Sequence, residues 1–82
     1  MSMIIKILGS GCATCKNLES RVREVIARNN IEAEVMKISE IQEIMTYGIM
    51  RTPGLVVNEV VKSSGTIPKD EKILEWLHEA VS

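Results

Sequence analysis

Apolar and polar positions in the first half of the chain follow two different periods. Residues 3–8 are apolar except at Lys6, which predicts a buried strand. Residues 13–28 carry apolar side chains at helical spacing, and a pair of asparagines ends that pattern. Residues 31–38 begin by alternating apolar with acidic side chains, which is typical of a half-buried strand. We therefore expect a strand, a helix and a second strand.

A second helix is expected over residues 41–49. Positions i, i+3, i+4, i+7 and i+8, which together form one face of a helix, are Ile41, Ile44, Met45, Gly48 and Ile49. Ser39 with Gln42 fits a capping box at its start. The segment 51–53, which contains a proline, is expected to end it.

The last third of the chain predicts a hairpin and a third helix. Two short runs rich in β-branched residues, 54–57 and 60–63, flank Asn58 and Glu59, which suit a tight turn. Pro68 and the two acidic residues close behind it suit the first turn of a helix. The expected inner face of that helix consists of Ile73, Leu74, Leu77, Ala80 and Val81.

The element order is therefore β-α-β-α-β-β-α, which belongs to the α/β class. A β-α-β crossover makes the first two strands parallel, whereas a hairpin is antiparallel within itself. The expected architecture is a four-stranded mixed sheet flanked by three helices. No linker, repeat or low-complexity segment interrupts the chain, so we expect residues 1–82 to form a single domain.

Composition and charge narrow the classes of partner. Hydrophobic residues make up 45% of the chain, enough for one core, and nearly all are aliphatic. A net charge of −1 gives no electrostatic reason to expect nucleic acid or an anionic membrane as partner. No apolar run exceeds three residues, and the first residues lack the pattern of a signal peptide. We expect a cytoplasmic protein, and a monomer.

The two cysteines form one Cys-x-x-Cys motif between the first strand and the first helix. A helix N-terminus carries a partial positive charge that stabilises a thiolate, the reactive form of cysteine. Cys12 is expected to be the exposed nucleophile, since Gly9 and Gly11 leave the turn uncrowded. Cys15 lies one helical turn further on, where it could resolve a mixed disulfide between Cys12 and a substrate. In a reducing compartment such a pair is more naturally redox-active or metal-binding than structural.

Three segments together carry a resemblance to a known family: residues 7–15 (Ile-Leu-Gly-Ser-Gly-Cys-Ala-Thr-Cys), 47–49 (Tyr-Gly-Ile) and 52–57 (Thr-Pro-Gly-Leu-Val-Val). The chain resembles the thioredoxin superfamily in its minimal form. More narrowly, it is similar to the small redox-active disulfide proteins, which are thioredoxin-like but of glutaredoxin size. The resemblance covers essentially the whole chain, and its specific part is the Cys-x-x-Cys paired with Thr-Pro.

The resemblance implies a disulfide oxidoreductase that takes part in electron transport and cell redox homeostasis and needs no cofactor. It implies that Pro53 is a cis-proline beside the cysteines and that the backbone of Thr52 pairs with a bound substrate strand. Its implied partners are protein disulfides and an upstream reductase. The chain departs from thioredoxins proper at Gly11, where they carry Trp, and at Lys6, where they carry a buried acid.

Two other functions remain open from the sequence. The motif Gly11-Cys12-x-x-Cys15 after a strand also resembles the heavy-metal-associated domain, in which two thiolates hold Cu(I). Those domains end in a strand, whereas this chain ends in a helical pattern. Structural zinc fits less well, because it normally takes four ligands. A thioredoxin-like adaptor that binds partners without turnover is the third possibility.

Overall fold

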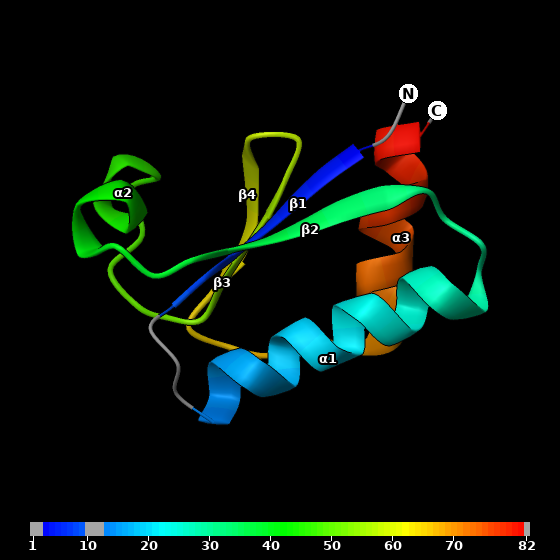
Figure 1. Ribbon diagram of the computed structural model, residues 1–82, viewed down its shortest axis with the longest axis horizontal. Coiled ribbons are helices and arrows are strands. Elements are labelled where there is room, and N and C mark those ends of the chain that lie inside the picture. The colour runs from blue at the N-terminus through cyan, green and yellow to red at the C-terminus, as the bar shows by residue number, and fades with distance from the viewer. Residues whose placement is uncertain (1–2, 10–12, 82) are drawn as a thin grey trace.

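The computed structural model describes residues 3–9 and 13–81, and the order of its elements is the predicted one, β-α-β-α-β-β-α (Figure 1). The described residues form four strands and three helices. Their bounds are β1 (Met3–Leu8), α1 (Ala13–Arg28), β2 (Ala33–Ile38), α2 (Ile41–Thr46), β3 (Gly54–Val57), β4 (Val60–Ser64) and α3 (Asp70–Val81). The predicted α/β class and element order are confirmed.

The four strands form one mixed sheet in the order β2-β1-β3-β4. β1 pairs with β2 in parallel along its whole length, from Met3 opposite Ala33 to Leu8 opposite Ile38. The other pairs, β1 with β3 and β3 with β4, are antiparallel. The parallel crossover and the antiparallel hairpin are thus confirmed, and β1 lies inside the sheet with a neighbour on each side.

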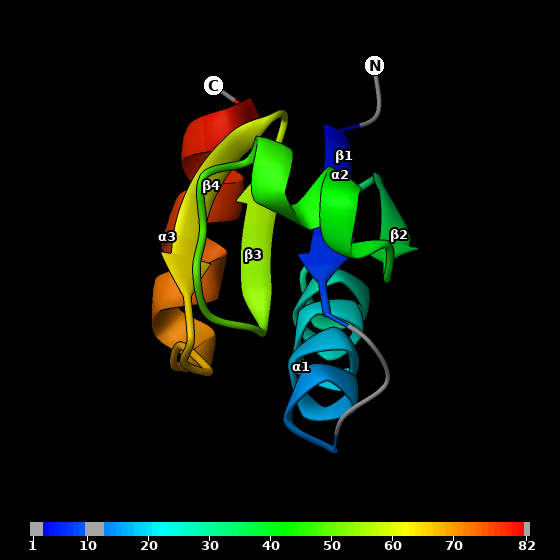
Figure 2. The ribbon, with the colours of Figure 1, turned by 90° about the vertical axis from the view of Figure 1, so that its left-hand side faces the viewer.

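Helices cover both faces of the sheet, with α1 and α3 on one face and α2 on the other (Figures 1 and 2). Alternation along β1 divides its side chains between two cores, because successive strand residues point to opposite faces. Ile5 and Ile7 belong to the larger core, with Leu18 of α1 and Leu77 of α3. On the other face, the smaller core consists of Leu8, Ile38, Ile44 and Val56.

The second helix starts at Ile41 as predicted, but its cap and its end differ from the prediction. It starts after Glu40, which makes no side-chain capping bond, so the predicted capping box of Ser39 and Gln42 does not form. It ends at Thr46, and Gly48 has a φ of 76° that few residues other than glycine adopt readily. The predicted extension to residue 49 is wrong because this left-handed glycine turns the chain away. Ile49 nevertheless packs against the smaller core, which explains why its spacing matched.

The hairpin and the last helix follow the sequence closely. Asn58 and Glu59 both have positive φ, as a two-residue turn between twisted strands requires. In α3, Ile73 and Leu77 are fully buried, as their places on the predicted inner face require. Within residues 3–9 and 13–81, no helix has the length and apolarity needed to cross a membrane.

Candidate functional site

Cys15 lies in the first turn of α1, which starts at Ala13. Its side chain is 5% exposed, and its sulfur is disulfide-bonded. Cys12, the only other cysteine of the chain, and Gly11 lie outside the described residues. The structure therefore places the predicted resolving cysteine where the sequence put it, on the inner side of the helix start.

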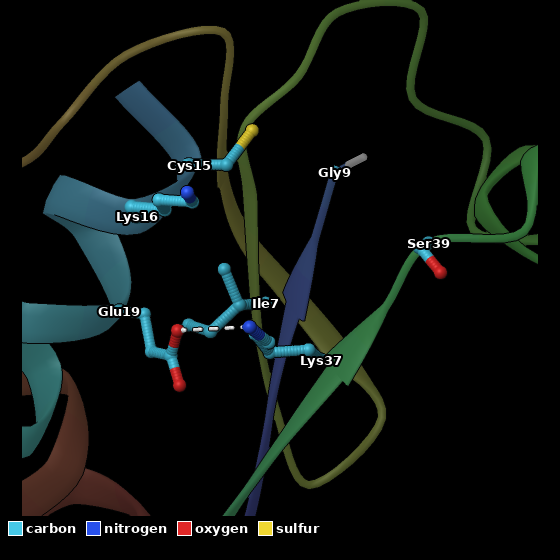
Figure 3. Close-up of a pocket in the computed structure, with 7 residues that line it drawn as sticks. All are labelled: Ile7, Gly9, Cys15, Lys16, Glu19, Lys37 and Ser39. Atoms are coloured by element: carbon cyan, nitrogen blue, oxygen red, sulfur yellow. Dashed lines mark ion pairs between the residues drawn. The ribbon is translucent and has the colours of Figure 1, made fainter. Parts of the chain in front are cut away.

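Gly9, directly after β1, lies next to the side chain of Cys15 (Figure 3). A Cβ atom on Gly9 would lie 2.3 Å from the Cys15 Sγ and 3.2 Å from the Cys15 Cβ. The same atom would lie 3.7 Å from the Cβ of Thr52. Only a residue without a side chain leaves room here for the sulfur. Gly9 is therefore the point at which Cys15 and Thr52, far apart in sequence, come together.

Thr52 and Pro53 reach this point from the segment before β3. The peptide bond between them is cis, and the Pro53 side chain is fully buried. The Pro53 carbonyl accepts a hydrogen bond of 2.8 Å from the backbone N–H of Gly65. Since β3 starts at Gly54 and pairs with β1, the proline is anchored to the strand that leads to the cysteine motif. Thr52, in contrast, is exposed.

A hollow of about 220 Å³ lies beside Cys15, between α1 and the ends of β1 and β2 (Figure 3). Lys16, Glu19, Lys37 and Ser39 supply its polar lining. The Lys37 Nζ lies 3.6 Å from a Glu19 carboxylate oxygen, and this ion pair joins β2 to α1. Sequence reasoning missed both residues of this pair. The available signal was that Glu19 stands four residues after Cys15, on the same helix face.

Comparison with known proteins agrees with this geometry. A family model described as a thioredoxin domain matches residues 3–78. The chain belongs to the thioredoxin domain family. A thioredoxin from Methanothermobacter thermautotrophicus is 39% identical over 92% of this chain and 97% of its own length. A thioredoxin from Methanocaldococcus jannaschii is 32% identical over 92% of this chain and 86% of its own. The predicted resemblance is confirmed, and the chain is a thioredoxin-like redox protein.

A solved structure extends the likeness in fold beyond these relatives. A thioredoxin variant from Halobacterium salinarum superposes with a TM-score of 0.73, covering 99% of this chain and 76% of that one. The identity between the two is 18%, so this match speaks for the fold alone.

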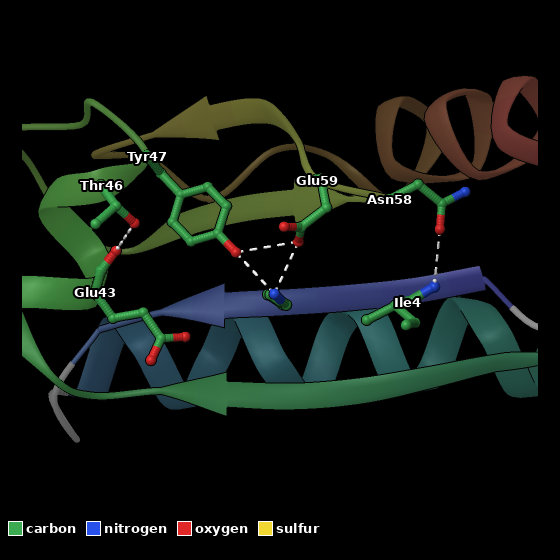
Figure 4. A network of polar contacts seen from close by, with 7 residues as sticks. Ile4, Glu43, Thr46, Tyr47, Asn58 and Glu59 are labelled. Atoms are coloured by element: carbon green, nitrogen blue, oxygen red, sulfur yellow. Dashed lines mark hydrogen bonds and ion pairs between the residues drawn. The ribbon is translucent and has the colours of Figure 1, made fainter.

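Lys6, the departure from thioredoxins noted above, takes part in a polar cluster on the face of the sheet that α2 partly covers (Figure 4). Its Nζ donates a hydrogen bond of 2.8 Å to the Tyr47 hydroxyl and lies 2.8 Å from a Glu59 carboxylate oxygen. The Tyr47 hydroxyl donates to the same carboxylate at 3.1 Å. Because Lys6 and Ile7 point to opposite faces, the ammonium group of Lys6 lies across the sheet from Cys15.

This cluster makes the stability of the protein depend on pH. The hydrogen bond from Lys6, with a smaller contribution from Tyr47, lowers the pKa of Glu59, and the reciprocal bonds raise the pKa of Lys6. A carboxyl group whose pKa is lowered on folding stabilises the fold at any pH above its pKa in the unfolded chain. This contribution is lost as the pH falls through its pKa in the folded protein. Wild type is therefore expected to exceed Glu59→Gln in urea midpoint at neutral pH and to lose that advantage below about pH 4.

The matched control is Glu75→Gln, which removes a carboxylate from an exposed pair with Lys72 on α3. We expect a smaller difference there, because pairs between exposed side chains contribute little. Because the pKa of Lys6 is raised on folding, the stabilisation from its pair with Glu59 is retained up to the pKa of lysine in the unfolded chain. The difference between wild type and Glu59→Gln should therefore persist until about pH 10. A difference between wild type and Glu59→Gln that stays constant from pH 3 to 8 would contradict the assignment.

Proposed function

We propose that this protein is a thiol–disulfide oxidoreductase that exchanges a Cys12/Cys15 dithiol with disulfides of other proteins. The observation that carries the proposal is the meeting of the Cys15 sulfur with Thr52 at Gly9. It sets a buried sulfur near an exposed residue, Thr52, beside which a substrate could bind. Membership of the thioredoxin domain family supports the same chemistry.

The proposed cycle moves two electrons from the protein to its substrate. The Cys12 thiolate attacks one sulfur of the substrate disulfide, and the other substrate sulfur leaves as a thiolate that takes up a proton. The Cys15 thiol then loses its proton and attacks the Cys12 sulfur of the mixed disulfide. A Cys12–Cys15 disulfide forms, and the second substrate thiol is released. An upstream reductase returns the pair to the dithiol, and relative reduction potentials decide the direction.

The roles of the two sulfurs follow from their places relative to α1. Cys12 directly precedes Ala13, the first residue of α1, so the partial positive charge of that helix end would stabilise its thiolate. Cys15 is almost fully buried, and a buried sulfur is reached by an intramolecular attack rather than by a protein substrate. We therefore assign attack to Cys12 and resolution to Cys15.

Substrate binding is assigned to the segment on the exposed side of the site. An extended substrate chain would pair with the backbone of Thr52, adding a short strand beside the cysteines. Pro53 contributes by fixing that segment, since its side chain is buried and its carbonyl is bonded to Gly65. Gly11, next to the nucleophile in sequence, would leave the approach open.

Trapping with two single-cysteine variants tests the proposal. Reduced Cys15→Ser and Cys12→Ser are each mixed with a protein that contains an accessible disulfide, and covalent adducts are measured by mass spectrometry under non-reducing conditions. Cys15→Ser keeps the attacking sulfur and should accumulate a mixed disulfide. Cys12→Ser keeps only the buried sulfur and should accumulate almost none, and the wild type should reduce the substrate without an adduct.

The contrary outcomes separate the alternatives. Equal adduct formation by both variants would contradict the assigned roles. Tight Cu(I) binding by the reduced wild type, with no reduction of any disulfide, would favour the soft-metal carrier. Binding of a partner without a change in its disulfide would favour the adaptor.

A further inference from the structure

Arg51 is the one arginine that has no acidic partner among the residues that the structure describes. The chain has four arginines, and three of them form ion pairs: Arg21 with Asp70, Arg23 with Glu19 and Arg28 with Glu24. No hydrogen bond or ion pair joins Arg51 to any of the described residues. Its guanidinium therefore remains available to a partner molecule.

The stem of Arg51 is held in place although its charge is unpaired. A Cβ atom on Gly65 would lie 3.0 Å from the Cβ of Arg51 and 3.1 Å from its Cδ, so the stem lies against the Gly65 backbone. Gly65 in turn donates its N–H to the Pro53 carbonyl. Arg51 and Pro53 thus both contact Gly65, and Arg51 directly precedes Thr52, the residue proposed to bind substrate.

Arg51 lies in a groove whose other described lining residues are uncharged. Arg51 and Thr52 line one groove of about 440 Å³ together with apolar side chains from α2 and the segment after it. Met50 is 98% exposed and Met45 is 66% exposed, so this wall is open to solvent. Arg51 is the only charged residue among the described residues that line the groove. The charge preference of the groove therefore depends on this one side chain.

We propose that Arg51 makes this protein select disulfides whose cysteine stands next to an acidic residue. The inference rests on the proposed function, because it places the substrate chain along Thr52. An extended segment in that position would carry the residues flanking its cysteine past Arg51, whose guanidinium can pair with a carboxylate by charge-assisted hydrogen bonds. A charge at the rim of an interface acts mainly on the rate of association and on its salt dependence. Arg51 is thus a specificity-determining residue, separate from the sulfur chemistry.

Three symmetric peptide disulfides test the proposal. Each is a dimer of one short extended peptide, linked through its single cysteine, with both flanking residues Glu, Gln or Lys. Second-order rates of reduction by the reduced wild type are measured at low and high salt. The Glu peptide should react about threefold faster than the Gln peptide, and the Lys peptide about threefold slower, as expected for exposed ion pairs. High salt should shrink both ratios.

A charge reversal then identifies the residue responsible. Arg51→Glu should invert the preference, so that the Lys peptide reacts fastest. Arg28→Glu changes the net charge equally at the far end of α1 and should keep the wild-type order of rates. Lys16→Gln probes the hollow beside Cys15 and should also keep the wild-type order of rates. Circular dichroism of each variant verifies that it is folded.

The outcomes distinguish this inference from the function on which it rests. Equal rates with all three peptides would overturn the specificity while leaving disulfide reduction in place. A preference that survives Arg51→Glu but disappears in Lys16→Gln would overturn the assignment to Arg51. No reduction of any peptide, including the neutral Gln dimer, would overturn the proposed function and the selectivity with it.

Discussion

Replacement of Gly9 by alanine is expected to slow substrate reduction by about 100-fold and to destabilise the fold by about 1–3 kcal/mol. The added Cβ would lie 2.3 Å from the Cys15 sulfur, whereas non-bonded heavy atoms pack at about 3.5 Å. Cys15 would have to move by roughly 1 Å, and misplacement of a reacting group by that amount costs about two orders of magnitude in rate. Stopped-flow reduction of a protein disulfide measures the rate, and urea unfolding measures the stability.

Gly48→Ala is the matched control for this variant. A Cβ on Gly48 meets no atom within 4 Å, but its φ of 76° is unfavourable for alanine. We expect a stability loss of about 1–2 kcal/mol from the backbone alone, with the rate of reduction unchanged. Because both variants lose similar stability, a difference in rate isolates the contact with Cys15. Equal rates for Gly9→Ala and wild type would show that the sulfur tolerates displacement.

The second large effect is expected from truncation of Leu77 in α3. This side chain is 0% exposed in the larger core, and replacement by alanine should cost about 3 kcal/mol. A domain of this size has a total stability of about 5–15 kcal/mol, so the loss is a large fraction of it. The melting temperature should fall by about 15 °C, as measured by calorimetry.

Leu74→Ala makes the same chemical change one turn away on the same helix. Leu74 is only partly buried at the edge of that core, so its truncation leaves a smaller cavity and should cost about 1 kcal/mol. The helix propensity changes equally in both variants, so the difference between them measures burial. Similar losses for the two would mean that Leu77 does not anchor α3 to the sheet.

Much of the fold was predictable because its signals are local. The start and end of α1 agree with the spacing of Leu18, Val22 and Val25, which all face the core. The end of α2 was not predictable from spacing, because Ile49 keeps a helical position in sequence while packing from the segment that follows the turn. The deciding feature is the left-handed conformation of Gly48, which a helical pattern does not reveal.

The candidate site divides in the same way. Cys15 and Thr52 were identified from short motifs, because each has a recognisable residue close by in the sequence: Cys12 for Cys15 and Pro53 for Thr52. Lys37 and Glu19 were not, since their pairing depends on how far apart α1 and β2 lie in three dimensions. That Arg51 forms no ion pair with the described residues could not be predicted either, because ion pairing depends on which side chains meet in three dimensions.

The interior position of β1 has a consequence for how the protein moves. Every residue of this strand is paired with β2, and Ile5 to Leu8 are also paired with β3. Interior strands open to amide exchange only in rare, nearly global fluctuations, whereas edges and short helices open more often. The start of α1, which bears Cys15, is therefore expected to lie near one of the slowest-exchanging parts of the molecule, whereas the α2 side is expected to open more often. Substrate recognition and electron transfer would then involve parts of the molecule that differ in rigidity.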